Sequence, residues 1–391
     1  MTRPDAAQVS LFLASAERLA PGVAALAARI AEAPAPTNDE AERSALFERL
    51  CRERGLHTDV DALHDVVAVV PGERSGDDAP AVLVAAHLDT VFSRDTPISI
   101  RADGDFLHGP GIGDNSVGLA STLAVADLLR ETGVVPAVDV LLTGNVGEEG
   151  LGNLRGIRAV IDANPRIAAV IAVEGHNLGR VTHIAVGSRR LRITAVGPGG
   201  HSWGDFGRPN AIHALARLIA DLDAIVLPWA PKTTLSVGMI EGGISVNTIA
   251  PSATCLLDLR SIDAGALARL VQQVEEAIAR AEGDGIRFDV EVLGDRPAGE
   301  AALSSPAVRA ATGALAALGI EPSFDASSTD ANVELSRGIA AVCIGLTHGG
   351  NVHRPDEYID TRPLAAGITQ LALLALELAR MADAGVIAPR G

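Results

Sequence analysis

The sequence predicts an α/β protein, in which a mainly parallel sheet flanked by helices is interrupted by an inserted α+β domain. Short apolar runs typical of buried strands alternate with helical stretches in the first and last parts of the chain, a pattern typical of parallel sheets. Residues 183–294 instead follow the order strand, helix, strand, strand, helix, strand, which is the ferredoxin-like unit. We therefore expect one domain from residues 1–182 and 295–391, with 183–294 inserted into it.

Composition limits the classes of partner. The chain has 391 residues, with 49 acidic and 32 basic side chains and a net charge of −17, which disfavours nucleic acid or an anionic membrane. The three cysteines form no C-x-x-C pair, so we expect no disulfide and a reducing, cytoplasmic location. The first five residues lack a secretory signal pattern, and no uninterrupted apolar run approaches about 18 residues. No membrane span is expected.

The first part of the chain supplies most of the expected sheet. Residues 7–33 have a helical pattern with a break at Pro21-Gly22, and Thr37, Asn38 or Asp39 is expected to cap a helix that ends near Glu53. Apolar runs then predict strands over 66–70, 82–86, 138–143 and 167–173, with helices over 117–131 and 154–162.

The strands of the inserted domain are expected to have a different hydrophobic pattern, because they alternate apolar and polar residues as antiparallel strands do. Its predicted strands span 184–196, 234–240, 246–259 and 286–293, and its helices span 210–223 and 264–282. After it, the α/β pattern resumes with a helix over 306–318, a strand over 340–346 and a helix over 363–381.

Polar side chains stand where the expected parallel strands end. His87 follows one apolar run, and Asp89 lies on the same side of extended chain, so its carboxylate can accept a hydrogen bond from one ring nitrogen and leave the other for a metal. Glu148 and Glu149 follow a second strand, and Glu174 follows a third. Open α/β sheets place their sites at these carboxyl ends.

The donor types point to divalent metal. Two imidazoles and several carboxylates suit a borderline ion such as zinc. A pair of such ions needs a bridging carboxylate and an unligated base for the water between them. Asp114, in the glycine-rich loop 106–116, can bridge, and one of Glu148 and Glu149 can ligate while the other faces the water. The candidate set is His87, Asp114, Glu148, Glu149, Glu174 and His353.

Seven short motifs, in this order along the chain, resemble the co-catalytic zinc exopeptidase and deacylase family. That family includes aminoacylase, acetylornithine deacetylase, succinyl-diaminopimelate desuccinylase, glutamate carboxypeptidase and peptidase T. The resemblance covers essentially the whole chain. The matching residues are His87-Leu88-Asp89-Thr90, Gly111-Ile112-Gly113-Asp114-Asn115, Glu148-Glu149-Gly150, Gly199-Gly200-His201-Ser202, Val246-Asn247-Thr248, Asp258-Leu259-Arg260, and His353 four residues before Glu357.

The resemblance implies a role for each of these residues. His87 and Glu174 would complete one metal site and Glu149 and His353 the other, with Asp114 bridging both. Asp89 would orient His87, Glu148 would act as general base and then acid, His201 would polarise the scissile carbonyl, and Asn247 and Arg260 would hold the substrate's carboxylate or carbonyl. The cofactors would be two divalent ions, zinc first, with cobalt or manganese as alternatives. The inserted domain would be a dimerisation lid, which implies a homodimer.

The expected activity is that of a metallohydrolase cleaving an amide bond in a small N-acyl amino acid or short peptide. Aminopeptidase, carboxypeptidase and deacylase action all remain open; Glu174, where several aminopeptidases of the family have Asp, modestly favours the last two. Two alternatives remain: a non-catalytic metal-binding protein, and a serine hydrolase using Ser202 of the stretch Gly200-His201-Ser202-Trp203-Gly204. The serine alternative requires a helix directly after the nucleophile, whereas residues 205–209 intervene.

Some residues carry a competing structural interpretation. Arg260 can pair with Asp258 on its own strand, and His201 can cap the turn before Trp203. His108 and His348 lie near the expected site without an assigned contact. Five other histidines are expected on the surface or on helices, as most are in proteins: His57, His64, His176, His183 and His213.

Overall fold

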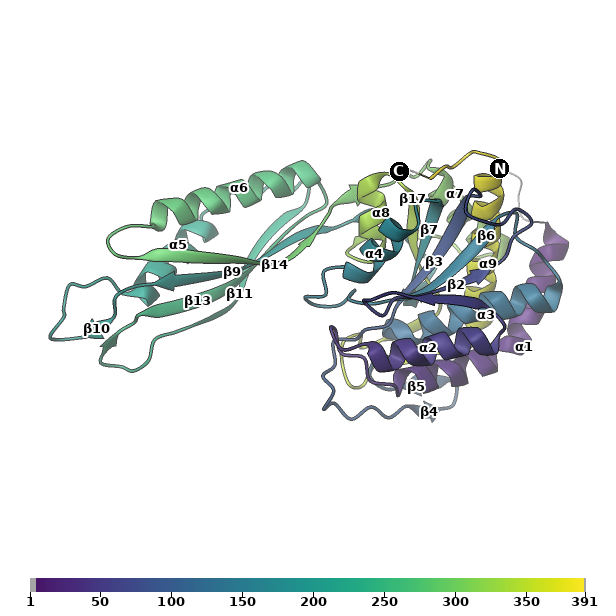
Figure 1. Ribbon diagram of the computed structural model, residues 1–391, viewed down its shortest axis with the longest axis horizontal. Coiled ribbons are helices and arrows are strands. Elements are labelled where there is room, and N and C mark those ends of the chain that lie inside the picture. Colours follow the sequence, from purple (N-terminus) through teal and green to yellow (C-terminus); the bar gives the residue numbers. More distant parts are fainter. Residues whose placement is uncertain (1–4, 390–391) are drawn as a thin grey trace. The chain divides into compact units, whose positions relative to one another are not determined.

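The computed structural model describes residues 5–389, which form two compact units (Figure 1). The large unit consists of the described residues up to Ala185 together with those from Glu300 onwards. The inserted unit is Val186–Gly299, where the sequence placed the insertion at 183–294. Each unit has its own hydrophobic core.

Within the described residues, the large unit contains a nine-stranded sheet in the order β1-β2-β6-β3-β7-β17-β8-β15, with β16 paired to β8. The central strands β6, β3, β7 and β17 run parallel, whereas β1 and β2 pair antiparallel at one edge. This architecture confirms the predicted α/β class. The strands are β1 His57–Val60, β2 Val66–Val70, β3 Ala81–His87, β6 Asp139–Asn145, β7 Ile167–Leu178, β8 Arg180–Ala185, β15 Gly299–Glu300, β16 Ser323–Ser327 and β17 Ala340–Gly345.

Helices cover both faces of this sheet (Figure 1). In β3, Val82 and Val84 pack into a core with α1, α2, α3, α7 and α9, while Leu83 and Ala85 face a second core with α4 and α8. A strand covered on both faces has no solvent side, so its sequence is continuously apolar. The helices are α1 Ala6–Ala31, α2 Ala41–Glu53, α3 Val117–Thr132, α4 Arg155–Ala163, α7 Pro306–Ala317, α8 Ala331–Arg337 and α9 Leu364–Asp383.

The inserted unit is an antiparallel four-stranded sheet in the order β11-β13-β9-β14, with two helices on one face. This order is the ferredoxin-like arrangement expected from the element sequence. A small ribbon of β10 and β12 stands apart from it. The elements are β9 Gly187–Val196, β10 Gly200–His201, α5 Ala211–Asp223, β11 Thr233–Gly242, β12 Thr248–Ile249, β13 Ser252–Ser261, α6 Ala264–Ala281 and β14 Arg287–Arg296.

Several local predictions were wrong. Helix α1 continues through Pro21, because packing against α3 and α9 outweighs the one hydrogen bond that a proline removes. Helix α2 has no side-chain cap at its N-cap residue Glu40. Strand β7 continues to Leu178, so Glu174 lies inside it. A second small sheet, in the order β18-β19-β5-β4, was not anticipated: β4 Arg101–Asp103, β5 Phe106–His108, β18 His348–Gly350 and β19 Tyr358–Asp360.

Two described helices, α1 and α9, are long and apolar enough to cross a membrane by length and composition, although no such segment was expected. In α9, 72% of the most apolar window is buried inside the protein, as in the core helix of a globular domain. Helix α1 buries the stripe that includes Phe12, Ala16, Val23 and Ala27. The first four residues, part of the segment that we compared with signal sequences, lie outside the described residues.

Candidate metal centre

The carboxyl ends of the central strands bring the candidate residues together. His87 is the last residue of β3 and pairs in register with Asn145, the last residue of β6. Glu148 and Glu149 follow β6, and Glu174 lies in the neighbouring strand β7. Asp114 lies in the turn η1 Ile112–Ser116 before α3. His353 follows β18, and its backbone is held in the left-handed region with φ +65°, a strained conformation that clusters at functional sites.

Asp114 lies between the two imidazoles. Its Oδ1 is 3.0 Å from His87 Nε2, and its Oδ2 is 3.1 Å from His353 Nε2. Glu149 Oε1 lies 2.9 Å from His353 Nε2, and Glu174 Oε2 lies 3.9 Å from His87 Nε2. The structure thus brings all five proposed ligands to one place, with one carboxylate and one imidazole on each side of Asp114.

The donor set fits divalent metal. Ligand atoms of His87, Asp114 and Glu149 all lie within 4.8 Å of one another. Two atoms bound to one tetrahedral zinc ion are about 3.3 Å apart, given bond lengths near 2.0–2.1 Å. The buried Nε2 of His87 makes no hydrogen bond, while Nδ1 lies 3.0 Å from a carbonyl oxygen that only accepts. His87 Nε2 therefore points at the Oδ1 of Asp114, 3.0 Å away, an arrangement that a shared proton or a metal ion between them stabilises.

Electrostatics in the cluster favour a cation as well. Burial lowers the pKa of His87, but the carboxylates of Asp114 and Glu174 outweigh burial and raise it well above its ordinary value. Hydrogen bonds to Asp114 and Glu149 raise the pKa of His353 to about 10. Burial alone would raise the pKa of Asp114, yet the two imidazoles hold it below its usual range. The centre therefore retains positive charge, as protons or as metal ions, next to its carboxylates.

Asp89 has a different contact from the one predicted. The carbonyl oxygen of Asp89, not its carboxylate, lies within hydrogen-bonding distance of His87 Nδ1; the nearest carboxylate oxygen is 3.7 Å away. The carboxylate instead accepts the backbone N–H groups of Glu148 and Glu149, each at 2.9 Å, and the hydroxyl of Thr37 at 2.8 Å. The Asp89 carboxylate thus points to the Glu148-Glu149 backbone and not to the imidazole of His87. The buried Asp89 side chain therefore holds the Glu148-Glu149 backbone.

Two buried groups behind Asp114 were missed. Glu357 is fully buried and accepts hydrogen bonds from His176 Nε2 and from the backbone of the Asp114 loop. His176 is 7% exposed and not a surface residue, and His183 is buried as well. In the sequence, each of the two lies near a candidate ligand: His176 is two residues after Glu174, and Glu357 is four residues after His353. Neither spacing by itself predicts a contact.

Arg43 is a further buried group that the sequence did not reveal. Its side chain is fully buried and donates to the carbonyl oxygens of Leu88, Ala33 and Ala31. Burial lowers its pKa to about 10, and the nearby charge of Asp89 opposes that shift. Arg43 thus ties the chain between His87 and Asp89 to the end of α1.

Three predicted substrate-binding residues lie in the inserted unit. The exposed His201 ring caps its own turn, because Nδ1 accepts the N–H groups of Trp203 and Gly204 at 3.2 Å each. This leaves Nε2 as the protonated nitrogen, which can donate. Asn247 is exposed, and its backbone carbonyl accepts the N–H of Ser202. Arg260 pairs with Asp258 at 2.6 Å, the structural interpretation considered above.

The serine-hydrolase arrangement is absent from the described residues around Ser202. It follows a two-residue strand, β10, and the next helix begins only at Ala211. A nucleophile elbow needs a strand, one sharp turn and an immediate helix. The local backbone therefore does not present Ser202 as a nucleophile.

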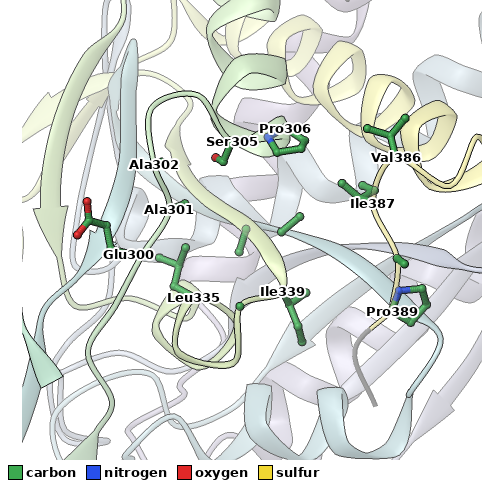
Figure 2. A pocket seen from close by; sticks show the side chains of 14 residues that line it. Glu300, Ala301, Ala302, Ser305, Pro306, Leu335, Ile339, Val386, Ile387 and Pro389 are labelled. Carbon is green, nitrogen blue, oxygen red and sulfur yellow. The ribbon is translucent and has the colours of Figure 1, made fainter.

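A separate pocket opens at the other end of β17, where the strand begins at Ala340 (Figure 2). It has a volume of about 530 Å³ and a mostly apolar lining that includes Ile339 and Ile387, with Glu300 as the one ionisable side chain. This lining offers no set of metal donors. The strand-end cluster is therefore the candidate reaction centre.

Comparison with known proteins identifies the family of the chain. The model of peptidase family M20/M25/M40 matches residues 83–377. A succinyl-diaminopimelate desuccinylase from Novosphingobium aromaticivorans is 28% identical over 317 residues, which cover 75% of this chain and 80% of that protein. The cytosol non-specific dipeptidase of Escherichia coli is 26% identical over 282 residues, covering 64% of this chain and 56% of that protein.

Solved structures share the fold. Aminopeptidase PepT from Bacillus cereus superposes with a TM-score of 0.76 at 21% identity, over 93% of this chain and 99% of that one. The YXEP protein of Bacillus subtilis, described as a dinuclear metal binding peptidase, has a TM-score of 0.70 at 19% identity, with coverages of 93% and 99%. The family inferred from the motifs is confirmed. Because the family model spans most of the chain, the protein belongs to peptidase family M20/M25/M40 and is a metal-dependent amidohydrolase.

Proposed function

We propose that the protein hydrolyses the amide bond of a small N-acyl amino acid or short peptide at a centre of two divalent metal ions. The observation that carries the proposal is the position of Asp114, whose two oxygens each face a different imidazole nitrogen. A carboxylate that presents one oxygen to each of two donor sets is the bridging ligand that paired metal sites require.

The ligands divide into two sets on this proposal. His87 and Glu174 hold one ion, Glu149 and His353 hold the other, and Asp114 is shared. When bound, ions such as zinc polarise a substrate carbonyl and bring the pKa of a bound water to about 7. Zinc suits the mixture of imidazole and carboxylate donors, with cobalt and manganese as alternatives.

Glu148 acts as the general base on this proposal. Its side chain is buried beside the cluster, 6% exposed, and its backbone N–H is fixed by Asp89. The adjacent Glu149 contacts His353, and on this proposal Glu149 is the ligand of the pair and Glu148 the base. Its carboxylate takes a proton from the attacking water and passes it to the nitrogen of the leaving amine, which completes the cleavage.

A small N-acyl or peptide substrate is supported by the relatives. The desuccinylase and dipeptidase compared above are named for small N-acyl and dipeptide substrates. On this proposal His201 donates Nε2–H to the scissile carbonyl, and Asn247 and Arg260 bind the carboxylate or carbonyl of the substrate. The pairing of Arg260 with Asp258 leaves the other guanidinium N–H groups to bind such an oxygen.

A homodimer formed through the inserted unit is part of the same proposal. In the described chain, every large apolar side chain that is at least three-quarters exposed lies in that unit: Trp203, Phe206, Val226, Trp229, Ile244 and Val246. Strand β11 is also an unpaired sheet edge, with Met239 and Ile240 more than half exposed. Exposed apolar surface and a free strand edge both favour association with a second copy. Such a dimer would be cytoplasmic, consistent with three buried free cysteines.

Paired substitutions test the chemistry. Glu148→Gln should retain both metal ions and the fold but lose about 10²–10⁴-fold in kcat, the usual effect of losing a general base. Glu149→Gln is the matched control and should lose metal in elemental analysis. The reverse result would show that the two roles are exchanged.

A substrate panel tests the reaction class. N-acyl amino acids and dipeptides assayed with and without EDTA should identify a metal-dependent amidase activity. Inhibition by a serine-directed phosphonate, with activity unaffected by EDTA, would refute the proposal. Metal binding without hydrolysis of any substrate in the panel would instead favour a metal-binding protein.

A further inference from the structure

We propose that Glu357, anchored by His176, is a positioning residue that sets the direction in which Asp114 presents its two oxygens. The inference rests on the proposed two-metal centre and adds to it a pair of residues with no ligand role of their own. Glu357 lies close to the centre without facing it, because its carboxylate contacts the backbone of the Asp114 loop.

The contacts of Glu357 converge on that loop. Its Oε2 accepts the Gly111 N–H at 2.7 Å, and its Oε1 accepts the Asp114 N–H at 2.9 Å. His176 Nε2 lies 2.8 Å from Oε1. The backbone carbonyl of Glu357 also accepts the Gly109 N–H at 2.8 Å. One buried residue thus accepts from three backbone positions of the loop.

The loop needs this support because its backbone is irregular. Gly111 has φ +69°, and Asp114 and Asn115 depart from helical geometry, with φ −112° and −133°. A backbone N–H outside regular structure needs another acceptor when it is buried. The Glu357 carboxyl group supplies acceptor oxygens for these N–H groups, which would otherwise be buried without a partner. Glu357 therefore holds the Asp114 backbone, while the Asp114 carboxylate faces the two imidazoles.

Glycines make room for the pair. A Cβ added to Gly113 would lie 2.0 Å from His176 Nε2 and 2.8 Å from Glu357 Oε1, and one added to Gly349 would lie 2.7 Å from the His176 ring. Both positions must be glycine for the imidazole to reach Glu357. His176 Nδ1 has no hydrogen-bond partner among the described residues, so the contact with Glu357 is the polar contact that orients this ring.

The precision that Asp114 requires explains why a positioning residue matters. Its two oxygens lie 3.0 and 3.1 Å from imidazoles on opposite sides, so a small rotation that improves one contact lengthens the other. Residues that orient metal ligands typically change metal affinity or activity by about 10–100-fold when they are replaced. A loss at Glu357 should therefore appear in metal binding, and not only in stability.

The test measures zinc binding to metal-free protein by titration calorimetry, together with the visible spectrum of the cobalt-loaded protein. Glu357→Gln directs an amide N–H₂ at a backbone donor whichever way it faces. We expect it to weaken binding of the second zinc ion by about 10–100-fold, and to lower kcat with little change in KM. Glu334→Gln is the matched control: it replaces another fully buried carboxyl group, on α8, whose pKa burial raises well above its ordinary value and which makes no contact with the Asp114 loop among those described.

Substitution of His176 provides an independent test if Glu357→Gln does not fold. His176→Ala should weaken the second zinc ion, and His176→Gln, which keeps a donor near the Nε2 position, should restore part of the affinity. Wild-type affinity for both ions in Glu357→Gln, or in His176→Ala, would overturn the inference. So would a loss confined to the melting temperature of the metal-free protein. A wild-type chain that binds fewer than two zinc ions would contradict the proposed function itself.

Discussion

Replacing Asp89 with asparagine tests whether this carboxylate organises the Glu148-Glu149 backbone. Oδ2 accepts from both Glu149 N–H and Thr37, while Oδ1 accepts from Glu148 N–H alone. The amide of Asp89→Asn should therefore keep its oxygen toward Glu149 and turn its N–H₂ against the Glu148 N–H. That loses one charge-assisted hydrogen bond and leaves a buried donor unpaired, which together cost about 2–5 kcal/mol in the free energy of unfolding.

The assay is thermal unfolding of metal-free protein, followed by kinetics of the metal-loaded enzyme. A cost of that size lowers Tm by about 5–15 °C, at roughly 2–4 °C per kcal/mol for a domain of this class. The neutral side chain also leaves the buried Arg43 without its nearby counter-charge. Thr37→Val is the control: it removes the hydroxyl bond alone and should cost about 1 kcal/mol. We expect kcat to fall by about 10–100-fold in Asp89→Asn. A Tm no lower than that of Thr37→Val, with kcat intact, would refute this reasoning.

Three further outcomes follow from the geometry. Asp114→Ala should lower bound metal from about two ions per chain to one or none, because the sites share this ligand; two retained ions with full activity would contradict the bridge. Neighbouring carboxylates raise the pKa of His353 to about 10 and, despite burial, raise the pKa of His87 well above its ordinary value. Metal binding should therefore release protons and strengthen as pH rises. Calorimetry in buffers of different ionisation enthalpy counts the released protons, and a count near zero would contradict this prediction. We also propose that His201 of one subunit serves the site of the other subunit in the dimer. Mixing His201→Ala with Glu148→Gln should then recover about a quarter of wild-type activity, because about half of the dimers would carry one intact site. Mixed dimers without activity would contradict this role of His201.

The fold could be predicted from the sequence wherever a pattern is local. Strand β3 is buried on both faces, so its continuous apolar run was unambiguous, and the alternation in β9 and β13 identified an antiparallel sheet. The break expected at Pro21 was wrong because tertiary packing supports α1 from outside the helix. The short strands β4, β5, β18 and β19 are stabilised by pairing between distant segments, which no local pattern reports.

The same contrast between local patterns and long-range contacts applies to the candidate site. The candidate metal-binding side chains could be found because imidazole and carboxylate groups at strand ends are unusual and their spacing is recognisable. The residues that hold them could not. Thr37 reaches Asp89 across 52 positions, and Glu357 reaches Gly111 across 246. Such contacts depend on the finished tertiary structure, and so does the direction of the Asp89 carboxylate, which accepts from Thr37, Glu148 and Glu149.

The central claim is that amide hydrolysis by this chain requires two metal ions bound at the Asp114 cluster. The most direct measurement is a zinc titration of EDTA-dialysed protein, with bound metal and hydrolysis of the best substrate from the panel followed in the same samples. The account predicts no hydrolysis without metal, and activity that rises to a plateau at about two ions per chain. Full hydrolysis by protein in which elemental analysis detects no metal would contradict it.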